Sequence, residues 1–233
     1  MFTNITLRKI AKFLFKAMLL FMVLSFLWVL CYRFINPPIT RLQLSRESSS
    51  GLKIQQQWIQ YDAMGDNIKM AVLCGEDQQF KMHNGFDFKA IRKARAGNAN
   101  GNSIRGASTI SQQTAKNVFL WEGRSWLRKG MEVWFTLLIE VMWGKERILE
   151  VYLNVIEMGP VESKNQTSPV FGCEAASHFY FHKSCKNLSM AQAAKIASVL
   201  PCPKKCGFGS RFAYSRQKII VRHMRRWGRQ LLP

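Results

Sequence analysis

An uncharged apolar run near the N-terminus is the feature that most constrains this chain. From Ala17 to Tyr32 the sequence AMLLFMVLSFLWVLCY carries no charged residue. With Phe13, Leu14 and Phe15 before Lys16, the run reaches the roughly 20 residues that a helix needs to cross a bilayer. Lys16 can extend its ammonium group to the lipid headgroups, and Trp28 and Tyr32 suit the opposite interface. The sequence therefore predicts a single transmembrane helix over residues 17–35.

The flanking segments predict the orientation of this span. Residues 1–16 contain four basic residues and no acid, which favours a cytoplasmic N-terminus and export of the remainder. The alternative is a cleaved signal peptide, but the residues after the run, Cys31 to Phe34, are bulky and do not form a small-residue cleavage site. Asn36-Pro37-Pro38 would end the helix. Residues 36–57 then form a polar juxtamembrane tether, and residues 58–233 form the exported domain.

Composition limits what the exported part can be. The chain has 233 residues, of which 48% are apolar, which is enough for one substantial domain but not for a second large one. The formal charge of +20 indicates an anionic partner, but the charge alone does not choose among nucleic acid, anionic lipid and a phosphorylated substrate.

Cysteine and histidine spacing does not predict a metal site. The six cysteines lack the paired spacing of a zinc ribbon. The nearest approach to a metal pattern straddles a turn and a helix rather than a knuckle: it consists of His178, His182, Cys185, Cys202 and Cys206. One disulfide among Cys173, Cys185, Cys202 and Cys206 fits an oxidising compartment, and its pairing stays open.

No segment shows clear strand alternation, so the domain is predicted to be mainly α-helical. Trp58 to Ile68 is expected to lead into a helix in which Ile68, Val72 and Leu73 have helical spacing. The Gly/Asn-rich stretch Gly97 to Asn102 is expected to be non-helical and mobile. Thr109 and Gln112 fit the capping box of the next helix. Further helices are predicted over 126–143, 145–156, 174–181 and 189–200, with a polar loop over 161–169. The first of these helices is expected to bury the stripe Leu127, Met131, Trp134, Leu138 and Val141.

The C-terminal tail is basic and amphipathic. From Pro203 to Pro233 it contains no acid, and it places Ile220, Met224, Trp227 and Leu231 on one helical stripe. Such a helix either lies on anionic lipid or packs onto the domain.

Three groups of residues are candidates for chemistry, each with a plainer interpretation. Glu76 and Asp77 follow an apolar run, which is also common where an ordinary helix ends. On the helix after Thr109, Gln113, Lys116 and Asn117 share a face that is either a binding surface or a solvated one. Glu132 follows Arg128 and Lys129 by about one turn. This arrangement is either a surface ion pair or a carboxylate presented into a basic cleft.

Taken together, these stretches resemble the monofunctional biosynthetic peptidoglycan transglycosylases of glycosyltransferase family 51. The likeness spans Ile68 to Met224, and its motifs come in the family's order. They are EDQQFKMHNGFD (Glu76 to Asp87), RGASTISQQTAKNVFL (Arg105 to Leu120), Arg124-Ser125-Trp126 with RKGME (Arg128 to Glu132), KERILEVYLN (Lys145 to Asn154), and a looser set at Arg216, Ile220, Val221 and Met224.

The resemblance implies a lysozyme-like helical fold and an activity. Members join lipid II, the acceptor, to a growing glycan chain held on undecaprenyl pyrophosphate, the donor, forming β-1,4 links with inversion. By position, Glu76 resembles the general base and Glu132 the second carboxylate, which assists the donor side either directly or through a divalent cation, Mg²⁺ or Mn²⁺. The implied substrate-binding residues are Asp77, Phe80, His83, Ser108, Thr109, Gln112, Gln113, Lys116, Asn117, Arg124, Arg128 and Lys129.

The resemblance also implies a setting. The protein would act at the bacterial cell inner membrane with its catalytic domain in the periplasm, without an organic cofactor. Cell-wall synthesis or division proteins are the expected partners, and no nucleic-acid module is recognisable. The sequence departs from the family at Gln192, where an acid is usual, at an insertion over Val161 to Pro169, and in its C-terminal cysteines.

Rival functions remain at this stage. A membrane-bound lysozyme-like hydrolase or lytic transglycosylase needs only the catalytic acid, and a non-catalytic basic lipid-binding protein needs only the charge. Ser50 to Lys53 and Ser215 to Lys218 match the Ser-x-x-Lys pattern of penicillin-binding transpeptidases. No Lys-Thr-Gly follows either match, and no chain remains for that domain, so we reject this interpretation.

Overall fold

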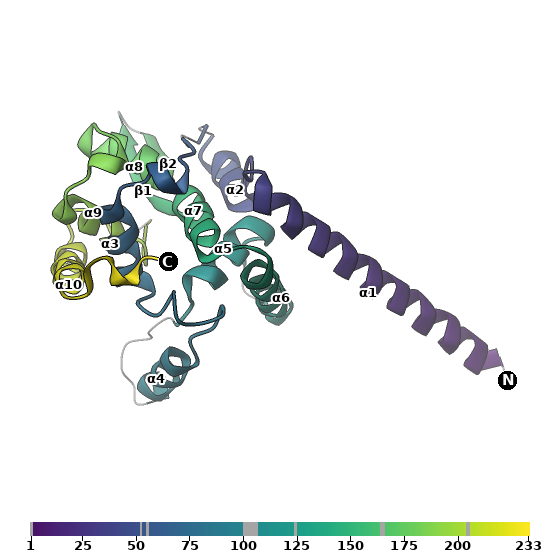
Figure 1. The fold of residues 1–233 in the computed structure, drawn as a ribbon. Coiled ribbons are helices and arrows are strands. Elements are labelled where there is room, and N and C mark those ends of the chain that lie inside the picture. Colours follow the sequence, from purple (N-terminus) through teal and green to yellow (C-terminus); the bar gives the residue numbers. More distant parts are fainter. Residues whose placement is uncertain are drawn as a thin grey trace. The chain divides into compact units, whose positions relative to one another are not determined.

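The computed structural model describes residues 2–51, 53–54, 56–99, 107–123, 125–163, 166–203 and 206–233. The side chains of residues 2–7, 50, 98–99, 160–163 and 166–168 are not described. The chain forms two compact units, Met1–Asn36 and Pro37–Pro233. The first unit is one helix, α1 (Phe2–Phe34), drawn in purple in Figure 1. Its segment Arg8–Phe34 is long and apolar enough to cross a membrane by length and composition.

The second unit begins before the predicted domain boundary. Its first helix, α2 (Arg41–Ser50), starts with a capping box between Thr40 and Gln43 and ends at Gly51, whose φ of +66° favours glycine. α2 packs against α5 (Ile110–Phe119) and against β2 (Gln166–Phe171). The segment that the sequence suggested as a tether therefore contains a helix that belongs to the second unit.

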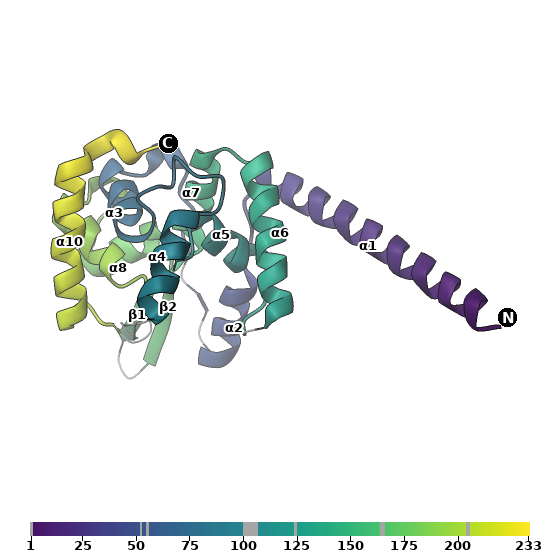
Figure 2. The ribbon, with the colours of Figure 1, turned by 90° about the horizontal axis from the view of Figure 1, so that it is seen from below.

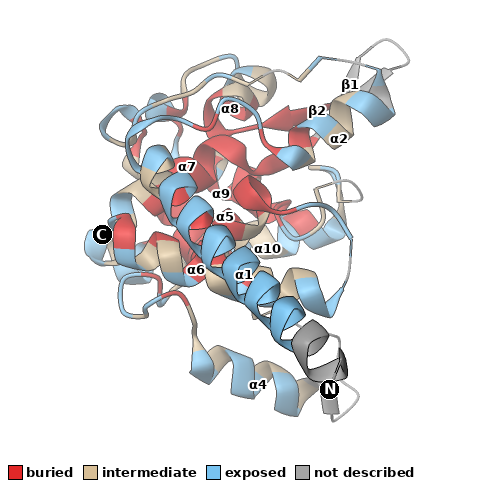
Figure 3. Cartoon of the chain, turned by 90° about the vertical axis from the view of Figure 1, so that its right-hand side faces the viewer, coloured by how far each residue is buried: buried red, intermediate tan, exposed pale blue. Residues whose placement is uncertain are grey.

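Buried helices make the centre of this unit. Every residue of α3 (Asp66–Glu76) from Ile68 to Cys74 is buried, and so is α7 (Lys145–Val155) from Val151 onward. Helical segments that are covered on every side in this way belong to the core. In Figure 3, α7 and α9 (Met190–Ser198) contribute to the red interior.

The C-terminal helix α10 (Arg211–Trp227) packs onto α9 and α3 and is followed by η3 (Gly228–Leu231). It buries Ala213, Ile220 and Met224, which decides between the two interpretations of the basic tail: its apolar stripe faces the domain. Two members of the predicted stripe are less buried, because Trp227 is 37% exposed and Leu231 is only partly covered. Figure 2 shows α10 and α6 (Trp126–Met142) at opposite edges of the unit.

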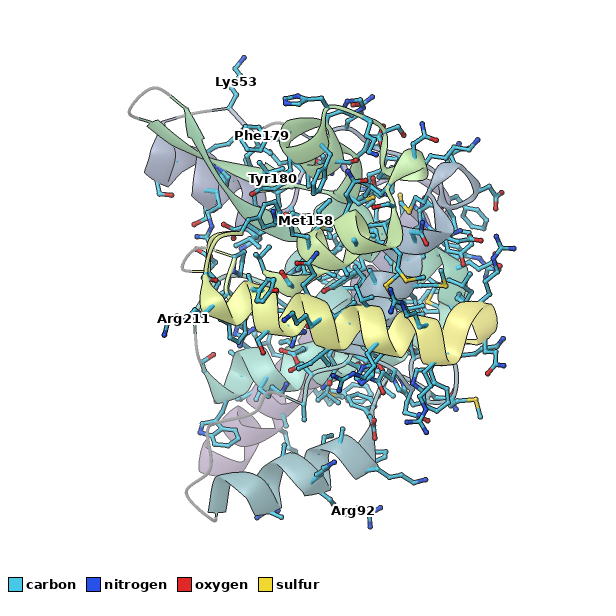
Figure 4. The ribbon with its side chains drawn as sticks, turned by 90° about the vertical axis from the view of Figure 1, so that its left-hand side faces the viewer. Lys53, Arg92, Met158, Phe179, Tyr180 and Arg211 are labelled. Atoms are coloured by element: carbon cyan, nitrogen blue, oxygen red, sulfur yellow. A yellow bond between two sulfur atoms is a disulfide. The ribbon has the colours of Figure 1, made fainter. Side chains whose placement is uncertain are left out.

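Helix α4 (Phe88–Ala99) corrects one prediction. It continues through Gly97 and Asn98, which were expected to be non-helical. A glycine within a helix costs only about 1 kcal/mol, so a helix that starts well can absorb it. The start is secured by Asp87, whose Oδ1 accepts the Ala90 N–H at 2.8 Å. Asn100 to Asn102 lie outside the described residues. In Figure 4, Arg92 on α4 points away from the rest of the unit.

The buried stripe predicted for α6 is wrong in register. Leu127 and Val141 are 71% and 84% exposed, whereas the buried residues are Glu132, Phe135, Thr136, Ile139 and Met142. α6 is apolar on both sides, so periodicity alone could not identify the inner one. Packing does so: Phe135 stacks on Phe119 of α5, with ring centroids 4.6 Å apart. Glu132 therefore lies on the inner face, not on a separate one.

The predicted loop over 161–169 is also wrong. β1 (Glu157–Ser163) and β2 form an antiparallel hairpin that pairs Val161 with Ser168 and has an irregular register between Glu157 and Pro160. Prolines and polar residues hide the strand alternation. The fold nevertheless stays mainly helical, as predicted.

One further helix and two short 3₁₀ turns complete the second unit. α8 (Cys173–Phe181) packs against both strands, and Figure 4 shows its Phe179 and Tyr180 close to Met158 of β1. Short turns η1 (Tyr61–Ala63) and η2 (Cys185–Asn187) flank the core. A disulfide joins Cys202 and Cys206, which rules out a metal site that uses these two cysteines.

Candidate active site

Glu76, the last residue of α3, is held by an arginine and an amide. Its Oε1 lies 2.6 Å from Arg216 Nη2 of α10, and its Oε2 accepts a hydrogen bond from Gln113 Nε2 of α5 at 3.2 Å. Arg216 also donates to the carbonyl of Gly75 at 2.6 Å. Only 12% of the Glu76 side chain is exposed. Both of its oxygens are thus fixed by residues far away in sequence.

A buried tyrosine orients this amide. Tyr152 of α7 is fully buried, and its hydroxyl donates to Gln113 Oε1 at 3.1 Å. Burial, together with the charges of Glu76 and Asp77, raises the pKa of Tyr152 well above its usual value, so the hydroxyl remains a donor. Because the carbonyl oxygen of Gln113 accepts from Tyr152, its NH₂ group is directed at Glu76.

The loop after Glu76 is tied to the start of α5. Gly85 N–H donates to His83 Nδ1 at 3.1 Å, so Nε2 carries the proton and donates to Asp77 Oδ2 at 3.0 Å. The same Asp77 oxygen accepts the N–H of Ile110 at 2.9 Å, near the positive end of the α5 dipole. Thr109 Oγ1 donates to the carbonyl of Gly85 at 2.6 Å.

Several predicted substrate-binding residues therefore make internal contacts. Asp77 and His83 bind each other, and Thr109 and Gln112 form the capping box of α5. Phe80 is only 1% exposed, and the ammonium of Lys145 lies 4.6 Å from the centroid of the Phe80 ring. Their visible role is to hold the Glu76 loop in place. Ser108 is exposed, and Arg124 lies outside the described residues.

A second carboxylate lies within a cluster of cations. Glu132 is 3% exposed, with Oε1 2.5 Å from Lys129 Nζ and Oε2 3.6 Å from Arg128 Nη1. Burial lowers the pKa of Lys116 on α5. The charge of Glu132 opposes this, whereas Arg128 and Lys129 add to it. Glu76 also acts on Lys116. The pKa of Lys116 thus responds to the charges of both carboxylates, although the two acids lie far apart in sequence.

Two pockets flank Gln113. The first, of about 270 Å³, is lined by Glu76, Asp87 and Ser108 among others. The second, of about 370 Å³, is lined by Gln113, Lys116, Asn117 and Arg128 together with residues of α2 and of the α9–α10 connection. Gln113 lines the second pocket and bonds to the carboxylate that lines the first.

The second pocket contains polar donors that lack partners. Asn117 Nδ2 and Arg128 Nε are buried, and no described residue accepts a hydrogen bond from either atom. A buried donor left unsatisfied costs about 1–3 kcal/mol. Oxygen-rich ligands, such as phosphates and sugars, supply the acceptors that these atoms need.

Sequence reasoning missed two residues of this region. Arg216 was identified only as part of the loosest motif, although that motif was a usable signal. No sequence pattern identified Arg46 of α2 as part of the site. Arg46 lines the second pocket, and its guanidinium lies 2.9 Å from Glu122 Oε1 and 3.2 Å from Glu157 Oε2. The partners of Arg46 are more than 70 residues away in sequence, so only the folded chain reveals the contact.

The residues around Glu132 do not fit a resident divalent ion. Both of its oxygens already face cations of the chain. Among the residues that the structure describes, no three His, Cys, Asp or Glu side chains gather as a ligand set.

A mainly helical domain with two carboxylates that both act on one buried lysine, a pocket lined by lysine and arginine, and an N-terminal helix apolar enough to cross a membrane fits a class of enzymes that act on sugars bearing anionic groups. Residues 45–225 match the family model described as Transglycosylase, and the chain belongs to this family.

Related proteins share sequence with this chain along most of its length. A biosynthetic peptidoglycan transglycosylase of Pseudomonas aeruginosa is 46% identical over 226 residues, covering 95% of this chain and 94% of the relative. One of Chromohalobacter salexigens is 47% identical over 229 residues, covering 95% and 94%. One of Pseudomonas fluorescens is 50% identical over 203 residues, covering 85% and 81%. The resemblance inferred from the motifs is confirmed.

Proposed function

We propose that this transglycosylase polymerises peptidoglycan glycan strands, with Glu76 as general base and the cations around Lys116 as the binding site for the donor's pyrophosphate. The family membership and the names of its relatives support the reaction. In it, the 4-hydroxyl of lipid II attacks C1 of the lipid-linked chain, the bond to pyrophosphate breaks, and a β-1,4 link forms with inversion.

Glu76 has the surroundings that a general base needs. A sugar hydroxyl is a poor nucleophile at neutral pH, and a positioned carboxylate that takes its proton contributes about 10²- to 10⁴-fold. Arg216 and Gln113 fix both carboxylate oxygens, and the carboxylate lines a pocket of about 270 Å³ in which an acceptor sugar would lie.

The unsatisfied donors of the second pocket carry the assignment of the donor site. Negative charge grows on the pyrophosphate as the C1–O bond breaks, so fixed cations stabilise the transition state more than the ground state. Lys116 and Arg128 supply positive charge, and Asn117 Nδ2 and Arg128 Nε are donors to which phosphate oxygens could hydrogen-bond. Glu132 holds Lys129 and Arg128 in position, so its role is to orient cations.

The apolar helix explains how the enzyme meets its substrates. Both substrates carry isoprenoid tails, so an anchored catalytic unit searches for them in two dimensions. The basic residues before the span favour a cytoplasmic N-terminus and a catalytic unit on the outer face of the inner membrane.

Polymerisation of lipid II by the purified full-length chain in detergent tests the proposal. We expect glycan polymer from the wild type and at least 100-fold less from each of Glu76→Gln and Glu132→Gln. The first change removes the group that takes the proton of the acceptor hydroxyl, and the second removes the charge that orients Lys129 and Arg128. The matched control is Glu146→Gln, an exposed carboxylate at the start of α7, which should keep full activity.

The same assay separates the rivals. A hydrolase or lytic transglycosylase would shorten preformed glycan and make no polymer from lipid II. A non-catalytic lipid-binding protein would show no turnover, and Glu76→Gln would change nothing that it does. Either result would refute the proposal.

A further inference from the structure

Two buried cysteines outside the active site face each other. Cys173 is the first residue of α8, and Cys185 is the first residue of η2. Both are fully buried, and their sulfurs lie 3.6 Å apart. We propose that Cys173 and Cys185 form a second disulfide in the mature protein, in addition to Cys202–Cys206.

Contacts that do not involve sulfur already hold the pair in place. Glu174 Oε2 accepts the N–H of Cys185 at 2.8 Å and the hydroxyl of Ser184 at 3.1 Å, while Ser177 Oγ donates to the carbonyl of Lys183 at 2.7 Å. The turn between α8 and η2 is thus fastened against α8 on both sides of the cysteines. Forming the bond requires the sulfurs to approach from 3.6 Å to about 2.05 Å.

The reaction is thiol–disulfide exchange with a disulfide oxidant, either a protein or a small molecule. One cysteine thiolate attacks a sulfur of the oxidant and forms a mixed disulfide with it. The second cysteine, as its thiolate, then attacks the protein sulfur of that mixed disulfide and displaces the oxidant. The products are the Cys173–Cys185 bond and the reduced dithiol of the oxidant, which takes up the two protons. The redox change is a two-electron oxidation of the pair, matched by reduction of the oxidant.

Burial sets when this exchange can occur. The contact with Cys173, and then burial, raise the pKa of the Cys185 thiol, so the reactive thiolate is scarce in the folded protein. No sulfur of the pair is exposed to an external oxidant. The bond therefore forms while the exported chain folds, and afterwards it is shielded from reductants. Cys202 and Cys206 are only partly covered and should be reduced more readily.

The bond would stabilise the position of α3, the helix that carries Glu76. A Cβ added to Gly65 would lie 2.6 Å from the carbonyl oxygen of Lys186 and 2.8 Å from that of Cys185, so η2 packs directly on this glycine. Gly65 is the N-cap of α3, whose last residue is Glu76. Asn67 Nδ2 of α3 also donates to the carbonyl of Leu188 at 2.8 Å. The disulfide would link this contact to α8 and the hairpin.

Peptide mapping of the full-length chain tests the pairing. The protein is produced with export, purified in detergent without reductant, alkylated with iodoacetamide in guanidinium and cut with trypsin. We expect the peptide of residues 165–183 linked to that of residues 184–186, and the peptide of residues 196–204 linked to that of residues 206–211. Recovery of Cys173 and Cys185 as separate alkylated peptides would overturn the proposal.

Two measurements test its physical basis. A phosphine reductant added to the folded protein should open Cys202–Cys206 at least tenfold faster than Cys173–Cys185, and equal rates would contradict the shielding. Cys185→Ala should lower the thermal midpoint by about 5–10 °C relative to the oxidised wild type. This difference should shrink severalfold when both proteins are refolded in reductant. A difference that persists unchanged would mean that packing, rather than a bond, is lost.

Discussion

Tyr152→Phe is a sharp test of how the candidate base is positioned. The change removes one buried hydroxyl that reaches Gln113 and leaves a ring of nearly the same volume. Tyr152 lines neither active-site pocket, so we class it as a positioning residue. Without its hydroxyl, the Gln113 amide is free to turn, and the carboxylate of Glu76 loses a fixed donor.

The expected loss follows from the hydrogen bonds. A typical intramolecular hydrogen bond contributes about 0.5–1.5 kcal/mol net, and water can replace the lost partner because Gln113 is only half-buried. If this energy is expressed in the transition state, kcat falls about 2- to 10-fold, since each 1.36 kcal/mol is tenfold in rate. The free energy of unfolding should fall by about 1 kcal/mol, which shifts the thermal midpoint by about 2–4 °C.

The assay is a double-mutant cycle on initial rates of lipid II polymerisation. Tyr152→Phe, Gln113→Ala and the double variant are compared with the wild type, with circular dichroism melting for each. We expect Tyr152→Phe to slow the wild type but to have almost no further effect in the Gln113→Ala background. An equal loss in both backgrounds would refute the Tyr152–Gln113–Glu76 relay, because the hydroxyl would then act by another route.

Three further outcomes are expected from single substitutions. Lys116→Arg should move the alkaline limb of the pH–activity profile to higher pH. Burial lowers the pKa of Lys116, so this lysine loses its charge at a lower pH than an ordinary lysine, whereas arginine stays charged. Identical alkaline limbs in the two proteins would argue against a role for the Lys116 charge. Burial acts to raise the pKa of Glu174, but hydrogen bonds from Cys185, Ser184 and His178 outweigh it and hold that pKa below its usual value. The resulting stability is present above the unfolded pKa of about 4.5 and is lost as the pH falls through the folded value. Glu174→Gln should therefore lower the free energy of unfolding by about 1–2 kcal/mol at pH 7, with the gap closing in acid, as urea titrations at several pH values would show. Gly85→Ala should lower the free energy of unfolding by about 1–3 kcal/mol, because φ at Gly85 is +87° and the new Cβ would lie 2.8 Å from Thr136 Cγ2. Gly130 has open space around it, so Gly130→Ala should leave the free energy of unfolding unchanged or raise it in the same urea titration.

Local signals predicted well wherever the neighbouring chain alone decides the structure. The capping box of Thr109 and Gln112 needs only four consecutive residues, and it forms as predicted. The bounds of α7 and α8 lie within a residue or so of expectation, because proline, glycine and polar residues mark their ends. The family resemblance supplied Glu76 and Glu132 as candidates, and the fold brings both within electrostatic reach of Lys116.

Features that depend on distant contacts could not be predicted in this way. The inner face of α6 is determined by the stacking of Phe119 on Phe135, and a helix that is apolar on both sides does not reveal that choice. The hairpin is stabilised by its own strand pairing and by α8, although its prolines argue against strand. Arg216 binds Glu76, which is 140 residues away, and Arg46 binds Glu157, which is 111 residues away, so their partners become visible only after folding.

The position of Arg46 bears on how soluble forms of this enzyme should be designed. A fragment cut at the suggested boundary before Trp58 would discard α2 and leave Glu157, whose side chain is 8% exposed, without its cation. Part of the wall of the lysine-lined pocket would be lost together with α1. Removing α1 after Asn36 instead preserves that wall, so inhibitor screens in aqueous buffer should use protein that begins at Pro37.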